Sequence, residues 1–344
     1  MTKMRPQAIQ HFLQKRYPEW RSIVVDNVDE ITSGWETRIY SFDVEYDQHE
    51  STKDLHLIAR VYAGAEARRK GEFEYSVLNE FRDRYPVPKV FFFEPDTEIF
   101  GGPFIVMERI IGPTLWDKFS CGNPLTNEDA LMIFTRCFVQ LHELDYKTFS
   151  MIPEEYKTIS PLQFELDRLE EKKSDLQNSN VSFLIPLVEW LEETVKEIEM
   201  TEISLLHRDF HPNNILLDAD ENPYVIDWTA ASIGDFRHDL AWTALLTELY
   251  AGEELSDNIL NDYKLVSRKT IANFDYFVIN ACLRRLSDIF ISLESSPEEM
   301  GMLESTRSLM LEQIGLVCKI QEIIEERTGI SISEIDSFVQ KYTS

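Results

Sequence analysis

The sequence predicts an α+β protein of two lobes, a small antiparallel-sheet lobe followed by a larger helical lobe. Short strand-like runs dominate residues 23–107, and helical periodicity dominates the chain after Gly112. The chain of 344 residues is long enough for two cores. We place the boundary so that residues 1–108 form the amino-terminal lobe and residues 109–344 form the carboxy-terminal lobe. Ligands tend to bind in the cleft between two such lobes.

The amino-terminal lobe is predicted from both helical and strand patterns. Apolar residues at helical spacing indicate a helix near 5–17 and a longer one over Glu66 to Phe81. The second helix ends before Tyr85-Pro86-Val87-Pro88, because proline cannot continue a helix. The predicted strands are Ile23 to Val28, Arg38 to Tyr46, Leu55 to Tyr62, Lys89 to Phe93 and Phe104 to Met107.

Helical periodicity continues through most of the carboxy-terminal lobe. Thr126-Asn127-Glu128-Asp129 resembles a helix start with Thr126 as its cap, and apolar residues then recur at helical spacing as far as Leu144. The further helical patterns cover 161–173, 183–199 and the chain from about 237 onward. Short apolar runs separated by polar turns lie between them, at Ser204 to Leu206, Ile215 to Leu217 and Tyr224 to Ile226.

Composition narrows the classes of partner. A formal net charge of −27 argues against nucleic acid and anionic membranes as partners. The charge leaves a cationic substrate open, although solubility is the simpler explanation. No apolar run approaches the roughly 18 to 20 residues of a membrane span, and the amino-terminal residues lack the apolar core of a signal peptide. The cysteines have no metal or redox spacing, so we expect a cytoplasmic protein of unspecified oligomeric state.

The segment with the clearest chemistry is His207-Arg208-Asp209-Phe210-His211-Pro212-Asn213-Asn214. It matches the pattern H-R-D-x-x-x-x-N of kinase catalytic loops, and Ile226-Asp227-Trp228 supplies a second aspartate after the next strand. Phosphoryl transfer needs a carboxylate that orients and deprotonates the acceptor hydroxyl, and oxygen ligands for the Mg²⁺ beside the triphosphate. Asp209 is therefore the candidate catalytic base, and Asn214 and Asp227 are the candidate Mg²⁺ ligands.

Further motifs accompany the catalytic loop in a fixed order. They are Ser33-Gly34-Trp35-Glu36-Thr37-Arg38, Pro86 to Val90, Gly101 to Gly112, Ile226-Asp227-Trp228 and Gly234 to Ala241. From about residue 30 to 245, the chain resembles the aminoglycoside phosphotransferase family, also called the phosphotransferase enzyme family, of the protein-kinase-like superfamily. The resemblance implies a protein-kinase-like fold in which residues 1–108 bind nucleotide and residues 109–344 carry catalysis and the substrate site. It also implies that Asp239 braces the catalytic loop from a helix start.

The upper lobe holds the candidate nucleotide contacts. The turn between the first two strands can lay backbone N–H groups over phosphates, and its candidates are Ser33, Gly34, Trp35 and Thr37. Strand alternation puts Ile58 and Arg60 on one face, so that Ile58 covers the adenine while Arg60 reaches the phosphates. Arginine stands there in place of the usual kinase lysine, and it keeps the charge while offering a bidentate fork.

Two more elements complete the expected nucleotide site. Glu74 is the expected helix partner of Arg60, with Glu72 as the close competitor. The end of the last strand is the expected hinge, where backbone groups bind adenine, and its candidates are Met107, Glu108 and Arg109. ATP is the expected nucleotide, and GTP remains an alternative.

The segment between Asp227 and Asp239 indicates the class of acceptor. Protein kinases place a longer segment ending in A-P-E after this aspartate, and neither the length nor the ending is present. We therefore expect transfer of the γ-phosphoryl group of ATP to a hydroxyl of a small molecule, such as an aminoglycoside, an amino-alcohol or a sugar. An acidic surface on the helix of Glu165, Asp167, Glu170 and Glu171 would suit a polycation, but we interpret it as a solvated face.

Two other functions remain open at this point. A catalytically weak pseudokinase that binds nucleotide or acts as a scaffold is the main alternative, motivated by Arg60 and the single glycine of the turn. The candidate residues Asp209, Asn214 and Asp227 argue against it. A protein kinase is the third and least favoured interpretation.

Overall fold

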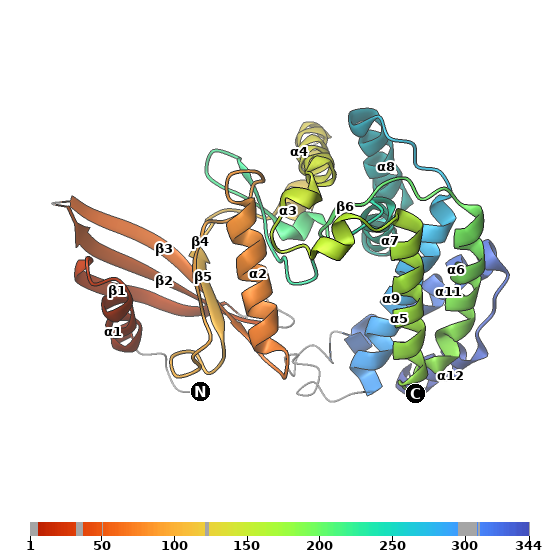
Figure 1. Cartoon of the computed structure of the whole chain (residues 1–344), viewed down its shortest axis with the longest axis horizontal. Coiled ribbons are helices and arrows are strands. Elements are labelled where there is room, and N and C mark those ends of the chain that lie inside the picture. The colour runs from red at the N-terminus through yellow and green to blue at the C-terminus, as the bar shows by residue number, and fades with distance from the viewer. Residues whose placement is uncertain are drawn as a thin grey trace. The chain divides into compact units, whose positions relative to one another are not determined.

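The computed structural model describes residues 6–31, 37–49, 51–120, 124–294, 308 and 310–343. Contacts divide the chain into two compact units. Unit 1 contains the described residues up to Gly112 together with Leu216–Thr229, and unit 2 contains Pro113–Ile215 and the described residues from Ala230 onward. Unit 1 is built on an antiparallel sheet and unit 2 is mainly helical (Figure 1), which confirms the predicted α+β class.

The sheet of unit 1 has five strands in the order β1-β2-β3-β5-β4, and each neighbouring pair is antiparallel. They are β1 (Arg21–Ile31), β2 (Thr37–Gln48), β3 (Ser51–Tyr62), β4 (Val90–Glu94) and β5 (Phe104–Glu108). Every strand predicted in this part of the chain is confirmed. In β3, Leu57, Ala59 and Val61 join the hydrophobic core that includes Ile9 and Leu13 of α1. By alternation, Ile58, Arg60 and Tyr62 belong to the opposite face.

Two helices pack on this sheet, as predicted. The helix α1 (Pro6–Arg16) contacts β1, and α2 (Ala67–Phe81) contacts β3, β4 and β5. A glycine at position 71 allows α2 to approach closely, because a Cβ there would lie 2.9 Å from the ring of Tyr62 and 2.8 Å from that of Phe93. The close approach brings the next turn of α2, which carries Glu74, against the Arg60 face of β3.

A β-hairpin completes unit 1. The strands β7 (Ile215–Leu217) and β8 (Pro223–Val225) pair with each other, and the Val225 N–H donates to the Pro86 carbonyl at 2.8 Å. Trp228 is buried and meets the rings of Phe81 and Tyr85 edge to face. These contacts fix the chain on both sides of Asp227.

Unit 2 is built mainly from helices. The helices are α3 (Leu115–Ser120), α4 (Pro124–Glu143), α5 (Pro161–Gln177), α6 (Ile185–Thr194), α7 (Arg237–Ala251), α8 (Glu253–Ser267), α9 (Phe274–Glu294), α11 (Ile314–Thr328) and α12 (Ser333–Thr343). Its core gathers apolar residues from α5, α6, α7, α9, α11 and α12. Two short strands, β6 (Ser204–Leu206) and β9 (Ser232–Gly234), pair in antiparallel fashion just before the catalytic loop and α7.

Three expectations for unit 2 need correction. The helix α4 begins at Pro124 rather than at Thr126, and proline suits a first turn because its missing N–H would have no intrahelical acceptor. The pattern over 183–199 is a shorter helix, which ends at Thr194 and continues only as a 3₁₀ turn. The strand β9 was not predicted, since Ser232-Ile233-Gly234 holds a single apolar residue and so shows no apolar run. Within the described parts of the chain, no helix combines the length and apolarity needed to cross a bilayer.

Candidate active site

Arg60 lies at the centre of a charge network within unit 1. Its Nη2 donates to Asp227 Oδ1 at 2.7 Å, and its Nη1 lies 3.4 Å from Glu74 Oε1. The side chains of Arg60 and Glu74 are 9% and 1% exposed, whereas that of Asp227 is 36% exposed. Burial alone would lower the pKa of Arg60, but Asp227 and Glu74 raise it above the ordinary value. The guanidinium therefore stays charged.

The partner of Arg60 on α2 is Glu74, whereas the competitor Glu72 is exposed. Glu74 also accepts hydrogen bonds from the Tyr62 hydroxyl at 2.5 Å and from the Trp228 N–H at 3.2 Å. The sequence analysis did not include Tyr62, although its position two residues after Arg60 places it on the same face of β3. One buried carboxylate thus joins β3, α2 and the segment after β8.

Asp227 has an unusual backbone and one free oxygen. Its φ of +68° lies in the left-handed region, which aspartate and asparagine adopt more often than most residues other than glycine. Oδ1 accepts from Arg60 and from the Thr229 hydroxyl at 3.1 Å. Among the described residues, Oδ2 has no hydrogen-bond partner. A partly exposed anionic oxygen is a ligand that Mg²⁺ prefers.

The remaining candidates of unit 1 lie along β2, β3 and β5. Ser33, Gly34 and Trp35 lie outside the described residues, and Thr37 is buried at the start of β2, opposite Tyr62. Ile58 is half-buried on β3, and Met107 is buried opposite it on β5.

At the end of β5, two of the backbone N–H groups expected to bind adenine already donate to carbonyls of the protein. The N–H of Glu108 donates to the Lys89 carbonyl, and that of Arg109 donates to the His56 carbonyl, both at 2.9 Å. Within the described chain, the Ile110 N–H has no acceptor. Ile110 is therefore a backbone donor that the sequence analysis missed, because the strand register decides which N–H groups remain free.

The catalytic loop of unit 2 fixes the carboxylate of Asp209. Trp242 Nε1 donates to Asp209 Oδ1 at 2.9 Å, and His211 Nε2 lies 3.5 Å from Oδ2. The side chain remains 34% exposed. Burial alone would raise the pKa of Asp209, but hydrogen bonding with His211 and Trp242 and the positive charge of Arg284 hold it below the ordinary value. Asp209 is therefore an ionised carboxylate with one oxygen anchored and the other within reach of solvent.

Asn214 is oriented by the same loop. Its Nδ2 donates to the backbone carbonyl of Asp209 at 2.9 Å and lies 3.2 Å from His211 Nε2. The amide oxygen has no hydrogen-bond partner in the described part of the chain. Asn214 Oδ1, like Asp227 Oδ2 in unit 1, is thus an unpaired hard oxygen atom of the kind that binds Mg²⁺. The described residues contain no cluster of three or more His, Cys, Asp or Glu that could hold a metal by itself.

The structure confirms that Asp239 braces the catalytic loop. Its Oδ2 accepts the His207 N–H at 2.7 Å and its Oδ1 accepts the Arg208 N–H at 2.8 Å, while His142 Nε2 lies 3.4 Å away. Arg208 adopts a φ of +69°, so these bonds hold a backbone that would otherwise be strained. Asp239 and Trp242 are three residues apart on α7 and so share a face, a spacing that could have identified Trp242 from the sequence.

Glu165 contradicts the interpretation of α5 as a solvated face. Asp167, Glu170 and Glu171 are exposed, as expected, but Glu165 is only 2% exposed. Its carboxylate binds His238 Nε2 at 2.9 Å and accepts a hydrogen bond from the Tyr276 hydroxyl at 2.7 Å. Leu169, four residues later, is also buried, so Glu165 lies on the inward face of α5.

Glu165→Gln is expected to remove an acid-sensitive part of the stability. Burial would raise the pKa of Glu165, but His238 and Tyr276 lower it from 4.5 to about 2. A depressed folded-state pKa stabilises the fold above the unfolded value and loses that effect as the pH falls toward the folded one. The free energy of unfolding of the wild type should exceed that of the variant by about 3 kcal/mol at pH 6. Urea titrations should find less than about half of this difference at pH 3, and a difference independent of pH would contradict the account.

Comparison with known proteins decides the family. Residues 27–275 match the model of the phosphotransferase enzyme family, and the match includes the Arg60 network and the whole catalytic loop. The chain belongs to this family. It is therefore a kinase-type phosphotransferase of the protein-kinase-like superfamily, as the sequence motifs predicted.

Solved structures share the fold of this phosphotransferase at low sequence identity. A putative aminoglycoside phosphotransferase from Ralstonia eutropha is 16% identical with a TM-score of 0.57, over 88% of this chain and 95% of that one. A thermostable mutant of aminoglycoside phosphotransferase APH(4)-Ia in complex with AMP-PNP and hygromycin B is 15% identical with a TM-score of 0.62. The match covers 94% of this chain and 100% of that one. These likenesses confirm the protein-kinase-like fold.

A curated relative matches part of the phosphotransferase. Acyl-CoA dehydrogenase family member 11 from Homo sapiens is 26% identical over 165 residues, which make up 47% of this chain and 21% of that protein. The protein of the same name from Pongo abelii matches to the same extent. The match spans about a fifth of the length of these relatives.

Proposed function

We propose that this phosphotransferase transfers the γ-phosphoryl group of ATP to a hydroxyl of a small molecule in a reaction that requires Mg²⁺. The observation that carries the proposal is the ionised Asp209 carboxylate, which is anchored on one oxygen by Trp242 and partly exposed. A loop that Asp239 holds in a strained backbone conformation presents this carboxylate. The solved relative with AMP-PNP and hygromycin B supports both a nucleotide donor and a compact acceptor.

Asp209 acts on the acceptor hydroxyl. The hydroxyl donates a hydrogen bond to Asp209 Oδ2, whose contacts with Asn214 Nδ2 and His211 Nε2 are long, at 3.4 and 3.5 Å, and the bond orients the alcohol oxygen toward the γ-phosphorus. The new bond joins the alcohol oxygen to the γ-phosphorus, while the bond from the γ-phosphorus to the β–γ bridging oxygen breaks. ADP leaves with that electron pair, and Asp209 takes the hydroxyl proton. The pKa of Asp209 lies below the ordinary value, so Asp209 is a weak base. It therefore takes the proton late, after the bond from the alcohol oxygen to the phosphorus has begun to form and has made the hydroxyl more acidic.

Asn214 and Asp227 are the residues that would hold Mg²⁺, and the proposal includes their convergence with Asp209. When bound, the ion would neutralise charge on the triphosphate. Arg60, fixed by Glu74, would contact the phosphates, as would the turn of Ser33, Gly34, Trp35 and Thr37. Ile58 and Met107, which are paired across β3 and β5, would contact the adenine, and the backbone of Glu108, Arg109 and Ile110 would bind its edge.

A pseudokinase that acts as a scaffold is the second candidate function. One specific observation favours it, namely the ion pair of 2.7 Å between Arg60 and Asp227, which occupies an oxygen of a proposed Mg²⁺ ligand. The free Oδ2 of Asp227 and the ordered catalytic loop favour an enzyme. GTP in place of ATP, the cytoplasmic location and the absence of nucleic-acid and membrane partners stay predictions.

Phosphorus NMR of the chain with ATP, Mg²⁺ and a panel of alcohols tests the proposed function. The panel contains kanamycin, choline, homoserine and glucose. We expect ADP and a phosphomonoester to appear together, and only when Mg²⁺ is present. Binding of nucleotide without turnover of ATP under every condition would instead support the scaffold.

Asp227→Ala is expected to lower the Mg²⁺-dependent turnover of ATP by about 100-fold or more, because one metal ligand is lost. The matched control is Asp220→Ala, which removes an exposed carboxylate from the turn between β7 and β8 and should leave turnover unchanged. Initial rates at several Mg²⁺ concentrations provide the measurement. Equal rates for Asp227→Ala and the wild type would remove Asp227 from the metal site.

A further inference from the structure

Arg284 on α9 reaches the catalytic loop from outside the part of the chain that matches the family. The family match ends at residue 275, whereas α9 runs from Phe274 to Glu294. Both α9 and the catalytic loop belong to unit 2. The Arg284 side chain is 23% exposed, and it makes two contacts beside Asp209. These contacts bear on how the catalytic carboxylate is held.

The first contact fixes the side chain that anchors Asp209. The Arg284 guanidinium lies 3.9 Å from the centre of the Trp242 ring, and Trp242 is buried on α7. The indole N–H lies in the plane of the ring, so the orientation of the ring sets the direction in which Nε1 donates. That donation goes to Asp209 Oδ1 at 2.9 Å. Because a hydrogen bond weakens steeply as its angle closes, a cation that holds the ring also holds this bond.

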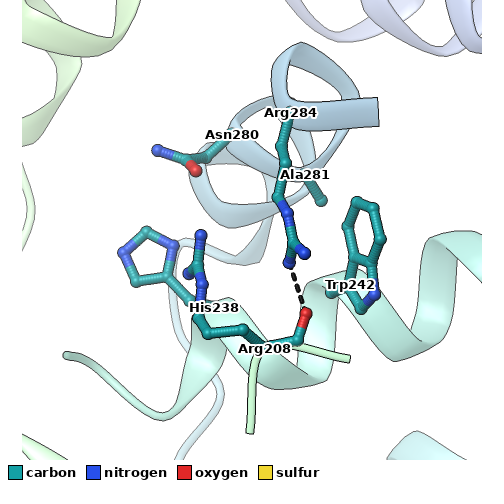
Figure 2. A pocket seen from close by; sticks show the side chains of 6 residues that line it. All are labelled: Arg208, His238, Trp242, Asn280, Ala281 and Arg284. Carbon is teal, nitrogen blue, oxygen red and sulfur yellow. Dashed lines mark hydrogen bonds between the residues drawn. The ribbon is translucent and has the colours of Figure 1, made fainter. Parts of the chain in front are cut away.

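The second contact fixes the backbone that leads into Asp209. Arg284 Nη1 donates to the carbonyl of Arg208. The N–H of the same peptide group belongs to Asp209, and it donates to His207 Nδ1 at 3.2 Å. A peptide group is planar, so holding both of its ends sets its orientation. Figure 2 shows Arg284 reaching from α9 to this carbonyl, with the Trp242 ring on one side and the Arg208 guanidinium on the other.

The remaining ion pair of Arg284 is too weak to account for its position. Its Nε lies 3.8 Å from Asp288 Oδ2, one turn later on α9, and the Asp288 side chain is 46% exposed. Exposed pairs of this kind contribute little to stability. An arginine guanidinium is always charged and planar, so its face can stack on an indole while its edge donates a hydrogen bond. The contacts with Trp242 and with the Arg208 carbonyl use both properties.

We propose that Arg284 is a positioning residue for the catalytic carboxylate. It acts on Asp209 through Trp242 and through the Arg208 carbonyl, and it does not contact the reacting atoms. The inference rests on the proposed function, in which Asp209 Oδ2 receives the acceptor hydroxyl, and it adds a residue from outside the family match. A displacement of about 1 Å in a group that orients a reactant lowers turnover by roughly 100-fold. Loss of Arg284 therefore acts on kcat rather than on nucleotide binding.

Arg284→Met removes the charge and the donors but keeps a side chain long enough to cover the Trp242 ring. We expect kcat for the preferred alcohol of the panel to fall by about 10- to 100-fold, with the KM of ATP and of the alcohol changed by less than about 3-fold. Arg284→Lys still places a cation over the ring and should recover part of the lost kcat. Arg327→Met is the matched control with wild-type kcat, because Arg327 on α11 pairs with the exposed Asp275.

The indole N–H signal of Trp242 is a readout that a merely structural role would not move. Proton–nitrogen NMR of the chain labelled at tryptophan gives one signal for each indole, and Trp242→Phe assigns the one of interest. A charge-assisted hydrogen bond to a carboxylate is strong, so weakening it moves the proton signal upfield. We expect Arg284→Met to shift this signal more than those of the other tryptophans, and Arg284→Lys to shift it less. Arg327→Met should leave it in place.

The double variant Arg284→Met/Trp242→Phe tests whether the two residues act on the same carboxylate. Independent residues would lower kcat by the product of the two single losses. We expect a loss smaller than this product, because each single variant already releases Asp209 Oδ1. A loss equal to the product would contradict the inference.

Failure of this inference is distinguishable from failure of the proposed function. Wild-type kcat in Arg284→Met would overturn the inference and leave the kinase intact, and so would a loss of kcat with an unmoved Trp242 signal. If Arg284→Met does not fold, Arg284→Lys carries the same comparison. If the wild type phosphorylates no alcohol, the kinase proposal fails and the Trp242 signal decides alone. A shift in the Arg284 variants then supports the positioning of Asp209, and no shift removes it.

Discussion

Asp209→Asn should lower kcat for phosphoryl transfer by roughly 10² to 10⁴-fold while leaving nucleotide affinity nearly unchanged. The amide has the shape of the carboxylate, and its oxygen can still accept the hydrogen bond from Trp242 Nε1, now 2.9 Å long. It cannot take the hydroxyl proton, and it carries no charge to orient the alcohol. The loss should therefore appear in kcat rather than in the KM of ATP. Initial-rate kinetics and nucleotide titration by calorimetry measure the two effects separately.

The matched control for this prediction is Asp220→Asn, the same substitution at an exposed position on the turn between β7 and β8. It should have wild-type kcat. A pH profile adds a second check, because the pKa of Asp209 lies below the ordinary value and wild-type activity should persist into mildly acidic solution. Unchanged turnover in Asp209→Asn would exclude Asp209 as the base.

Asp239→Ala is expected to cause the largest loss of stability, about 3 to 5 kcal/mol in the free energy of unfolding. The carboxylate is fully buried and accepts the N–H groups of His207 and Arg208 at 2.7 and 2.8 Å. Alanine would leave both buried donors without an acceptor. The catalytic loop would also lose the contact that holds Arg208 at positive φ, so activity should fall together with stability.

Urea unfolding of Asp239→Ala, Asp239→Asn and Asp117→Ala measures this effect. Asparagine restores one acceptor oxygen without charge, so its loss should be intermediate. Asp117 also accepts a backbone N–H, that of Thr114 at 2.8 Å, but it is exposed at the start of α3. Its removal should cost about 1 kcal/mol. Similar losses for Asp239→Ala and Asp117→Ala would mean that Asp239 does not hold the loop.

The elements of the fold were largely predictable because their signals are local. Each strand of the unit 1 sheet shows β-branched or aromatic residues, and α1 and α2 show clear helical periodicity. The predictions failed where the sequence pattern is very short or where two neighbouring residues could each begin a helix. The strand β9 holds one apolar residue, and α4 begins at Pro124, two residues before the predicted cap Thr126.

The candidate site was predictable where spacing along the chain defines it. Asp209 and Asn214 lie in one loop, and Asp239 lies in the first turn of the helix that braces this loop. Their spacing in the sequence motifs therefore sufficed to predict that they act together. Glu74 and Glu72 could not be separated by spacing, because burial against Tyr62 decides between them.

Residues brought together by tertiary contacts were missed. The contact between Trp242 and Asp209 depends on how α7 packs beneath the catalytic loop, and that of Arg284 with Trp242 depends on how α9 packs against α7. Glu165 was misjudged because an acidic residue among acidic residues suggests a surface, whereas its partners His238 and Tyr276 come from distant helices. Composition also pointed away from the cations beside Asp209, since a net charge does not locate a site.

A structure of the chain with Mg²⁺ and a non-hydrolysable ATP analogue tests the central claim most directly. We expect one ion bound by Asn214 Oδ1 and Asp227 Oδ2, with Oδ2 of Asp209 facing the γ-phosphate across the space of an alcohol oxygen. An analogue bound elsewhere, or an ion held without either Asn214 or Asp227 while Asp209 faces away from the phosphate, would contradict it.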